Sequence, residues 1–150
     1  MKEGDIKIRL LKADDFDAVV AIDEKVIKTS RQDYYELKFE KLFKSKDYLP
    51  VSLVAEGGDG NVLGFVIGEL FMGEDGVFPE DATLEIIGVD PDCRHKGIGE
   101  LLINEFMDHL RKVGVRRINT LVNSNDYRLV NFFKANRFNV SKDINLERGL

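Results

Sequence analysis

The spacing of apolar residues along the chain predicts short strands that alternate with amphipathic helices. Apolar positions three or four residues apart indicate a helix with one buried face, whereas short apolar runs rich in β-branched residues indicate strands. No linker, repeat or low-complexity segment interrupts the alternation, so residues 1–150 are predicted to form a single domain. The predicted elements are a strand over 5–11, helices over 14–26 and 34–43, a hairpin over 51–71, a strand over 83–89, a helix over 98–113, a strand over 117–122, a helix over 126–135, and a short hairpin formed by 138–140 and 144–146.

Three local signals predict where these elements begin or end. Asp14 is placed to cap the first helix, and Gly114 ends the helix that precedes it. The run 57–61, which holds three glycines, Asp59 and Asn61, separates two apolar runs and predicts the turn of the hairpin. The resulting order of strands and helices is typical of an α/β protein.

The segment 89–102 joins an apolar strand to an amphipathic helix through a basic turn that contains glycines. The start of a helix leaves several backbone N–H groups without partners and carries a partial positive charge, so both hold an anion there. Gly97 and Gly99 lack Cβ atoms and let the backbone approach the anion closely, and Arg94 and Lys96 add positive charge. The turn is therefore predicted to bind a phosphate group.

The spacing of the turn excludes two common phosphate-binding motifs. It contains no Gly-Lys-Ser/Thr of a P-loop, and its Gly-x-Gly pair lacks the third glycine of a dinucleotide fingerprint. Its distinguishing feature is Arg94, three residues before Gly97, together with Val89 and Pro91 at the end of the preceding strand. This Arg-x-x-Gly-x-Gly after Val-x-Pro resembles the coenzyme A signature of the GNAT N-acetyltransferase superfamily.

The resemblance covers most of the chain and implies a fold. Residues 8–22 resemble the first strand and helix of these enzymes, 51–71 their antiparallel hairpin, and 118–138 the strand and helix that complete the cofactor groove. The implied fold is of the α/β (α+β) class, with a mixed, mostly antiparallel central sheet and helices on both faces. In it the parallel strands predicted over 83–89 and 117–122 splay apart and form the coenzyme A groove.

The resemblance also implies that acetyl-CoA is the acyl donor. Its pantetheine arm would pair with the main chain around Ile87 and Val89 as an added strand does. Asn125 either hydrogen-bonds the pantetheine amides or caps the next helix. No His, Cys and carboxylate cluster has metal-ligand spacing, so no metal is expected. The predicted cofactor-binding residues are Ile87, Gly88, Val89, Arg94, His95, Lys96, Gly97, Ile98, Gly99, Asn125 and Phe132.

The implied reaction is attack of an amine on a thioester carbonyl. A lysine-like amine with a pKa of about 10.4 must lose a proton at a cost of about 4.6 kcal/mol at pH 7, whereas an α-amino group with a pKa of about 8 needs only about 1.4 kcal/mol. Glu85, in the strand beside the thioester, is the candidate general base; the alternative is a carboxylate that faces solvent. Main-chain N–H groups near Ile87 to Val89 are expected to hold the oxyanion.

The sequence departs from the family pattern at the leaving-group end. The family's helix carries a tyrosine near the sulfur and then a Gly-Phe pair, whereas this chain has Phe133 and then Arg137-Phe138. Phe133 cannot donate a proton, but departure of a thiolate at pH 7 costs only about 2 kcal/mol. A packing role is the alternative for each tyrosine that could replace it as the acid. These tyrosines are Tyr127, Tyr34, Tyr35 and Tyr48.

Composition narrows the setting. The chain is 43% hydrophobic and 33% charged, has no apolar run long enough to span a bilayer, no signal-like stretch at 1–5 and a single cysteine, Cys93. These features predict a globular, cytoplasmic protein with no membrane partner, in which Cys93 and His109 are structural. The net charge of −5 argues against nucleic acid and fits a cationic amine acceptor. Residues 34–43 and 73–81 are expected to shape the acceptor site.

The predicted function is therefore transfer of an acetyl group from acetyl-CoA to a primary amine by direct attack in a ternary complex. The acceptor is left open between a small molecule and a protein amino group, and a homodimer is also left open. The first alternative function is a non-catalytic acyl-CoA-binding module of the same fold. The second is a protein-interaction domain whose glycine turn binds no ligand.

Overall fold

The computed structural model describes residues 5–70 and 80–150. The chain forms two compact units, Met1–Thr120 and Leu121–Leu150. The first unit contains a sheet of five strands in the order β1-β2-β3-β4-β5; neighbouring strands are antiparallel except β4 and β5, which are parallel. The predicted mixed, mostly antiparallel sheet is therefore confirmed. The strands are β1 (Lys7–Leu10), β2 (Leu53–Glu56), β3 (Val62–Glu69), β4 (Asp81–Val89) and β5 (Arg117–Asn119).

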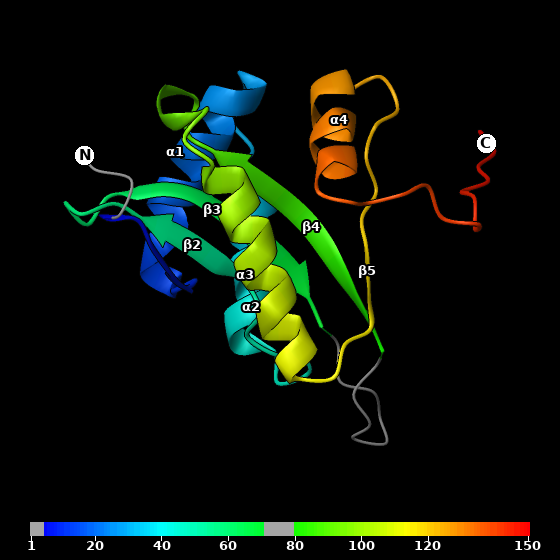
Figure 1. Cartoon of the computed structure of the whole chain (residues 1–150), viewed down its shortest axis with the longest axis horizontal. Helices are drawn as coiled ribbons and strands as arrows, with labels where there is room; N and C mark the ends of the chain where they lie inside the picture. Colours follow the sequence, from blue (N-terminus) through cyan, green and yellow to red (C-terminus); the bar gives the residue numbers. More distant parts are fainter. Residues whose placement is uncertain (1–4, 71–79) are drawn as a thin grey trace. The chain divides into compact units, whose positions relative to one another are not determined.

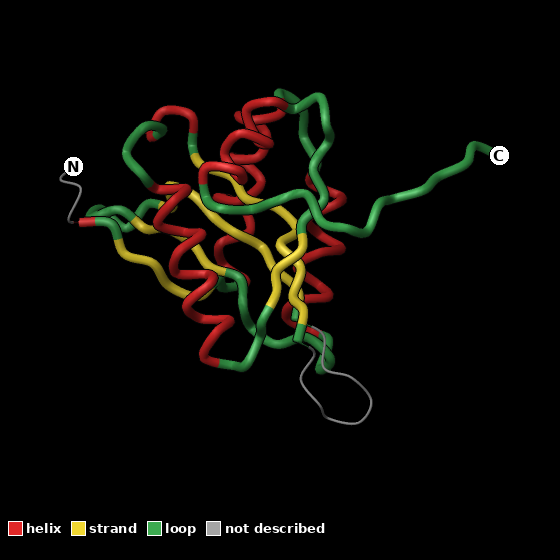
Figure 2. Tube along the Cα trace, turned by 45° about the vertical axis from the view of Figure 1, so that its right-hand side comes forward, coloured by secondary structure: helices red, strands yellow, loops and turns green. Residues whose placement is uncertain are grey.

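Three helices of the first unit lie on opposite faces of this sheet (Figures 1 and 2). On one face are α1 (Phe16–Ile27) and α2 (Gln32–Lys44), and on the other is α3 (Ile98–Lys112). All three lie where the apolar spacing predicts helices. The core between the sheet and the first two helices consists of Leu11, Val19, Ile22, Tyr35, Phe39, Val54, Phe65 and Ile67.

The packing of α3 on β3 is unusually close because β3 presents glycines to the helix. A Cβ atom at Gly68 would lie 2.4 Å from Cζ of Phe106, and one at Gly64 would lie 3.2 Å from Cδ1 of Leu102. Phe106 and Leu102 are fully buried. Interiors packed this densely do not tolerate added atoms without strain, so the packing fixes the position of α3 on the sheet.

The turn between β2 and β3 follows the sequence prediction. Gly60 adopts a left-handed φ of 88°, and the carboxylate of Asp59 accepts hydrogen bonds from both the backbone N–H and the side-chain amide of Asn61. Glycine adopts this conformation without steric cost, and the Asx bonds stabilise the reversal. The predicted hairpin is confirmed over Leu53–Glu69, and its expected end at residue 71 lies outside the described residues.

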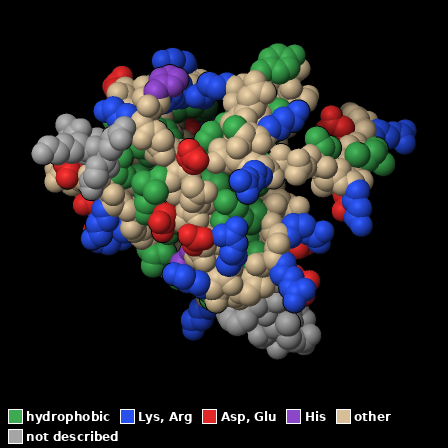
Figure 3. Space-filling model, in the orientation of Figure 1, with side chains coloured by type: hydrophobic (Ala, Val, Ile, Leu, Met, Phe, Trp, Pro, Cys, Tyr) green, Lys and Arg blue, Asp and Glu red, His purple; other side chains and the backbone are tan. Residues whose placement is uncertain are grey.

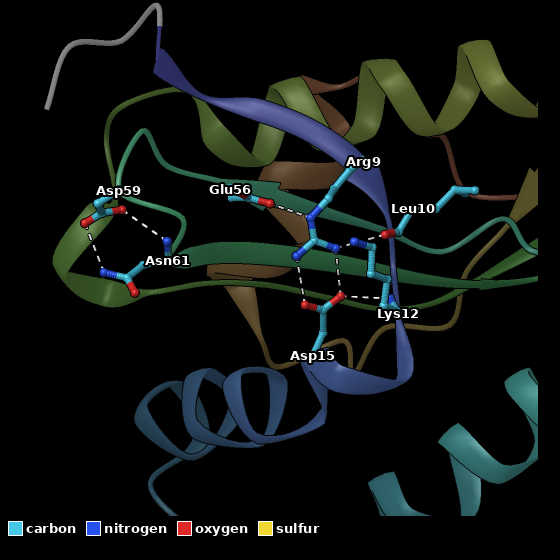
Figure 4. A network of polar contacts seen from close by, with 7 residues as sticks. All are labelled: Arg9, Leu10, Lys12, Asp15, Glu56, Asp59 and Asn61. Atoms are coloured by element: carbon cyan, nitrogen blue, oxygen red, sulfur yellow. Dashed lines mark hydrogen bonds and ion pairs between the residues drawn. The ribbon is translucent and has the colours of Figure 1, made fainter.

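An ion-pair network at Arg9 ties β1 to the start of α1 (Figure 4). The guanidinium of Arg9 donates two hydrogen bonds of 2.9 Å to the carboxylate of Asp15 and a third to Glu56 on β2. Burial would raise the pKa of Asp15, but these bonds and one from the backbone N–H of Lys12 outweigh burial and lower it. Asp15 is therefore a carboxylate held by a half-buried cation.

The prediction that Asp14 caps α1 is wrong. The helix begins at Phe16, the residue before it is Asp15, and Asp14 is exposed. Neither carboxylate makes a capping hydrogen bond to this helix: Asp15 accepts instead from Arg9 and from Lys12. A bidentate pair with a guanidinium is stronger than a single hydrogen bond to a backbone N–H, which accounts for the contact of Asp15 with Arg9.

The second unit contains one helix, α4 (Tyr127–Ala135), followed by irregular chain. Asp126 caps the helix by accepting a hydrogen bond of 3.2 Å from the backbone N–H of Leu129. The predicted hairpin of 138–140 with 144–146 is wrong, since the described residues 136–150 contain no strand. Val140 and Leu146 are 86% and 84% exposed, so no apolar face is buried to support two short strands.

We expect Asp15→Asn to lower the free energy of unfolding by about 1–3 kcal/mol at pH 7, because the half-buried guanidinium of Arg9 loses a charged partner. The pKa of Asp15 is lowered by folding, so its stabilising effect is present above the ordinary value of 3.8 and is lost as the pH falls through the lower folded-state value. Urea unfolding at stepwise lower pH measures this. The difference between parent and variant should shrink below pH 3.8.

Asp14→Asn is the matched control. Because Asp14 is exposed, the substitution should change the free energy of unfolding by less than about 0.5 kcal/mol. Equal destabilisation by the two variants would show that the Arg9–Asp15 pair does not contribute to the free energy of unfolding.

Candidate functional site

The main chain of β4 has different neighbours on its two edges. On one edge it pairs with β3 along almost its whole length, with Ile87 opposite Val66 and Val89 opposite Gly64. On the other edge it pairs with β5 only from Asp81 to Thr83. The hydroxyl of Thr120 then donates a hydrogen bond of 2.9 Å to the carbonyl of Leu84, where the ladder ends. The predicted splayed parallel pair is confirmed, although β5 is shorter than the predicted strand.

The turn after β4 is built from ordered polar contacts. Asp90 caps a short 3₁₀ turn, η3 (Pro91–Cys93), by accepting a hydrogen bond of 3.0 Å from the backbone N–H of Asp92. Lys25 on α1 reaches Asp90 at 3.2 Å. The chain then passes through left-handed conformations at His95, with φ of 67°, and Gly97, with φ of 76°. These contacts direct the chain from the end of β4 into α3.

The N-terminus of α3 fits an anion. Gly97 is the residue before the helix, and no side chain within the described residues caps it. A Cβ atom at Gly97 would have no neighbour within 4 Å, and the N–H groups of the first turn have no partner within the helix. Lys96 is exposed and Arg94 half-buried beside them. Ile98 is 2% exposed and fixes the first turn against the sheet. The structure therefore brings together the predicted phosphate-binding residues of the first unit.

A β-bulge determines the direction of Glu85. Ile67 of β3 is opposite Ile86, and the next residue, Gly68, is opposite Leu84, so Glu85 is the extra residue of β4. Gly68 faces α3, and its partner Leu84 shares that face, whereas Ile86 packs into the core beneath α1 and α2. Counted back from Ile86, regular alternation would put Glu85 on the α3 face. The bulge instead lets its side chain reach α2.

Lys38 on α2 is the partner of Glu85, and the sequence analysis missed it. Its Nζ lies 3.3 Å from Oε2 of Glu85 and 2.6 Å from Oε1 of Glu69 at the end of β3, and its side chain is only 9% exposed. Burial would lower the pKa of Lys38, but the hydrogen bond to Glu69 and the surrounding negative groups raise it. One signal was present: Lys38 has the spacing of the apolar stripe that includes Tyr35 and Phe39.

A hollow of about 530 Å³ runs along α2 next to this cluster. Tyr34 and Lys38 line it, as does Leu37, which is 68% exposed. Burial raises the pKa of Tyr34. Of the smaller contributions, that of Lys38 lowers this pKa and that of Glu85 raises it, and the phenol stays neutral. Five of its seven lining residues lie within 34–43, a segment expected to shape the acceptor site. Most of the other expected segment, 73–81, lies outside the described residues.

The remaining predicted residues lie on the second unit. Asn125 is exposed and does not cap α4, since that role belongs to Asp126. Tyr127 is 71% exposed, and Phe132 is half-buried with its ring 5.5 Å from that of Phe133. Their roles toward a cofactor stay predictions.

Phe133 and Arg137 occupy the positions where the chain departs from the family pattern. Phe133 is 5% exposed, and its ring lies 5.0 Å from that of Phe138, so it packs within its own unit. Arg137 has a left-handed φ of 70°. A non-glycine residue there costs about 1–2 kcal/mol, which explains why glycine suits this position.

Cys93 and the two histidines lie in different surroundings. Cys93 is half-buried and its N–H donates to the carbonyl of Asp90, while His95 is exposed. Nε2 of His109 lies 3.2 Å from the carbonyl of Pro50, in keeping with its predicted structural role. Within 5–70 and 80–150, no three His, Cys, Asp or Glu side chains are grouped to hold a metal ion, and no helix is long and apolar enough to cross a membrane.

The family model "Acetyltransferase (GNAT) family" matches residues 16–138. The chain belongs to this family. The match confirms the predicted family, and the class of enzyme that the family names is acetyltransferase. A mycothiol acetyltransferase from Propionibacterium freudenreichii subsp. shermanii is 34% identical over 55 residues, which are 37% of this chain and 18% of that protein. The chain thus matches less than a fifth of the length of this curated relative.

Solved structures of acetyltransferases share the fold of this GNAT chain. An aminoglycoside N-acetyltransferase, AAC(6')-Iy, in complex with CoA superposes with a TM-score of 0.76 at 17% identity, covering 96% of this chain and 94% of that one. The ribosomal-protein-S18-alanine N-acetyltransferase from Escherichia coli gives a TM-score of 0.73 at 22% identity, covering 91% and 79%. At these identities the likeness shows the fold, and it confirms the predicted fold class.

Proposed function

We propose that this chain is an N-acetyltransferase that moves an acetyl group from acetyl-CoA to a primary amine, with residues 1–150 acting as a single domain. One observation carries the proposal: β4 leaves its parallel partner after Thr83 and leads directly into a basic turn and an uncapped helix N-terminus. An exposed strand edge suits the amides of an extended ligand arm, and the helix start suits its phosphates.

The residues that would hold acetyl-CoA follow one another along the chain. The main chain at 87–89 would pair with the pantetheine arm, and its N–H groups would donate to the carbonyl oxygen. Arg94, Lys96 and the N-terminus of α3 would hold the pyrophosphate. When bound, acetyl-CoA would supply an acetyl group activated as a thioester. The complex of AAC(6')-Iy with CoA supports this choice of donor.

Glu85 is proposed as the general base that takes the proton of the acceptor amine. Its side chain is 27% exposed and extends from β4 to Lys38 on α2. Among the described residues, Lys38 contacts its Oε2, which leaves Oε1 for the acceptor. A carboxylate with one oxygen fixed and the other accessible is well placed to accept a proton.

The acceptor is proposed to be a cationic amine. Glu69 and Glu85 share the single ammonium of Lys38, so this cluster keeps one net negative charge. The hollow along α2 lies beside it. The named relatives act on chemically different amines, an aminoglycoside and a protein alanine, so the family narrows the acceptor no further.

We expect Glu85→Gln to lower kcat for amine acetylation by about 10²–10³-fold, because the amide cannot accept the proton. Coenzyme A affinity should stay within about twofold, since the cofactor residues are unchanged. Release of free CoA in the presence of an amine panel measures turnover, and calorimetric titration with CoA measures binding.

Glu105→Gln, at an exposed position of α3, is the matched control and should retain full activity. If the parent binds CoA but acetylates no amine in the panel, the non-catalytic acyl-CoA-binding module replaces the enzyme. If the parent shows no CoA binding at millimolar concentration, the whole proposal fails.

The cofactor turn is tested by a pair of glycine substitutions. Gly97 and Gly60 both have left-handed φ and open space at the Cβ position, so alanine should cost each about 1–2 kcal/mol of stability. Only Gly97→Ala should also weaken CoA binding, by tenfold or more, because only Gly97 lies at the start of α3. Thermal unfolding of both variants measures the cost in stability, and titration with CoA measures binding. Equal CoA affinities of the two variants would show that the turn is not part of the cofactor site.

A further inference from the structure

We propose that Lys38 is a positioning residue that holds the carboxylate of Glu85 toward the acceptor. The inference rests on the proposed role of Glu85 as the base. Lys38 comes from α2, Glu69 from the end of β3 and Glu85 from the bulge of β4, so one ammonium joins three elements. No other described cation contacts Glu85.

The geometry gives the two carboxylates different tasks. Glu69 is the nearer, at 2.6 Å, and its hydrogen bond fixes the end of the Lys38 side chain. Glu85 lies farther away, at 3.3 Å, and contacts the ammonium through Oε2 alone. Glu69 therefore anchors the lysine, and the anchored lysine orients Glu85. A charged group held in this way loses less freedom when the acceptor binds.

Lys38 is not itself suited to accept an acetyl group. Its side chain is 9% exposed, and the hydrogen bond to Glu69 outweighs burial and raises its pKa, so it stays an ammonium at neutral pH. The ring of Tyr34, also on α2, lies 5.8 Å from its Nζ. An ammonium without a lone pair is not a nucleophile, which leaves an electrostatic role.

The charge balance of the cluster predicts the pH dependence of the reaction. Without Lys38, the carboxylates of Glu69 and Glu85 would face each other with no cation between them, which disfavours ionisation of both. Without the charge of Glu69, Lys38 would act on Glu85 alone and favour its ionisation. The other facing groups are Tyr34, whose raised pKa keeps it neutral, and Arg31 above the Tyr34 ring, which stays a cation.

The experiment compares the kcat/KM–pH profiles of Lys38→Met and Glu69→Gln with the parent. We expect Lys38→Met to lower kcat by about tenfold and to move the acid limb to higher pH, because it removes the cation. Glu69→Gln should move the acid limb to lower pH. Lys38→Arg should restore most of the activity, and CoA affinity should be unchanged in all three.

A double-variant cycle separates positioning from a structural role. If Lys38 acts through Glu85, Lys38→Met should lower kcat little further in a Glu85→Gln background. Lys112→Met, an exposed lysine at the end of α3, is the control for loss of a charge. Thermal unfolding of each variant shows whether it folds. Should Lys38→Met not fold, the opposite shift expected of Glu69→Gln still tests the inference.

Two results would overturn the inference. One is an acid limb that stays in place in both Lys38→Met and Glu69→Gln; the other is an equal loss of kcat from Lys38→Met with and without Glu85. If Glu85→Gln lowers kcat while either result is found, only the role of Lys38 is wrong. If Glu85→Gln is fully active, the proposed base is wrong and the role of Lys38 is overturned with it.

Discussion

The hydrogen-bonding capacity of the β4 main chain is the constraint on which the rest of the structure depends. Buried backbone groups require partners. β3 provides them along one edge, whereas β5 provides them on the other edge only as far as Thr83. The close contact of α3 with Gly64 and Gly68 fixes where the helix after the turn begins. The open strand edge and the helix N-terminus are therefore consecutive parts of one rigid frame, whose front face carries interspersed acidic and basic side chains (Figure 3).

On the face of the sheet covered by α1 and α2, the contacts of Lys38 depend on side-chain charges rather than on main-chain hydrogen bonds. A buried lysine is costly unless it is paired, and Lys38 is stable because two carboxylates reach it. One of them, Glu85, lies at the point where β4 contains an extra residue relative to β3. The interior beneath α1 and α2 thus contains an ion cluster at its margin. This cluster links the catalytic proposal to the helix that lines the hollow.

The sequence predicts those features that depend on local pattern. Apolar spacing and glycine composition locate the strands, the helices and the basic turn, because each signal lies within a few neighbouring residues. Features set by distant partners were not predictable. The bulge at Glu85 depends on register with β3, Lys38 meets carboxylates 31 and 47 positions away, and Arg9 determines why Asp15 rather than Asp14 carries the local charge. At 138–146, most of the apolar side chains of the predicted strands are exposed rather than packed, and no hairpin forms.

The two sides of β4 also differ in how freely they can change. The proposed donor side combines main-chain groups and a helix N-terminus held by tight packing with the side chains of Arg94 and Lys96. The proposed acceptor side combines Glu69 and Glu85 with α2, six of whose residues line the hollow together with Ser45. In the proposed assignment, the exposed positions of α2 lie outside the residues that would hold acetyl-CoA, so substitutions there would change the acceptor site and leave the donor site intact.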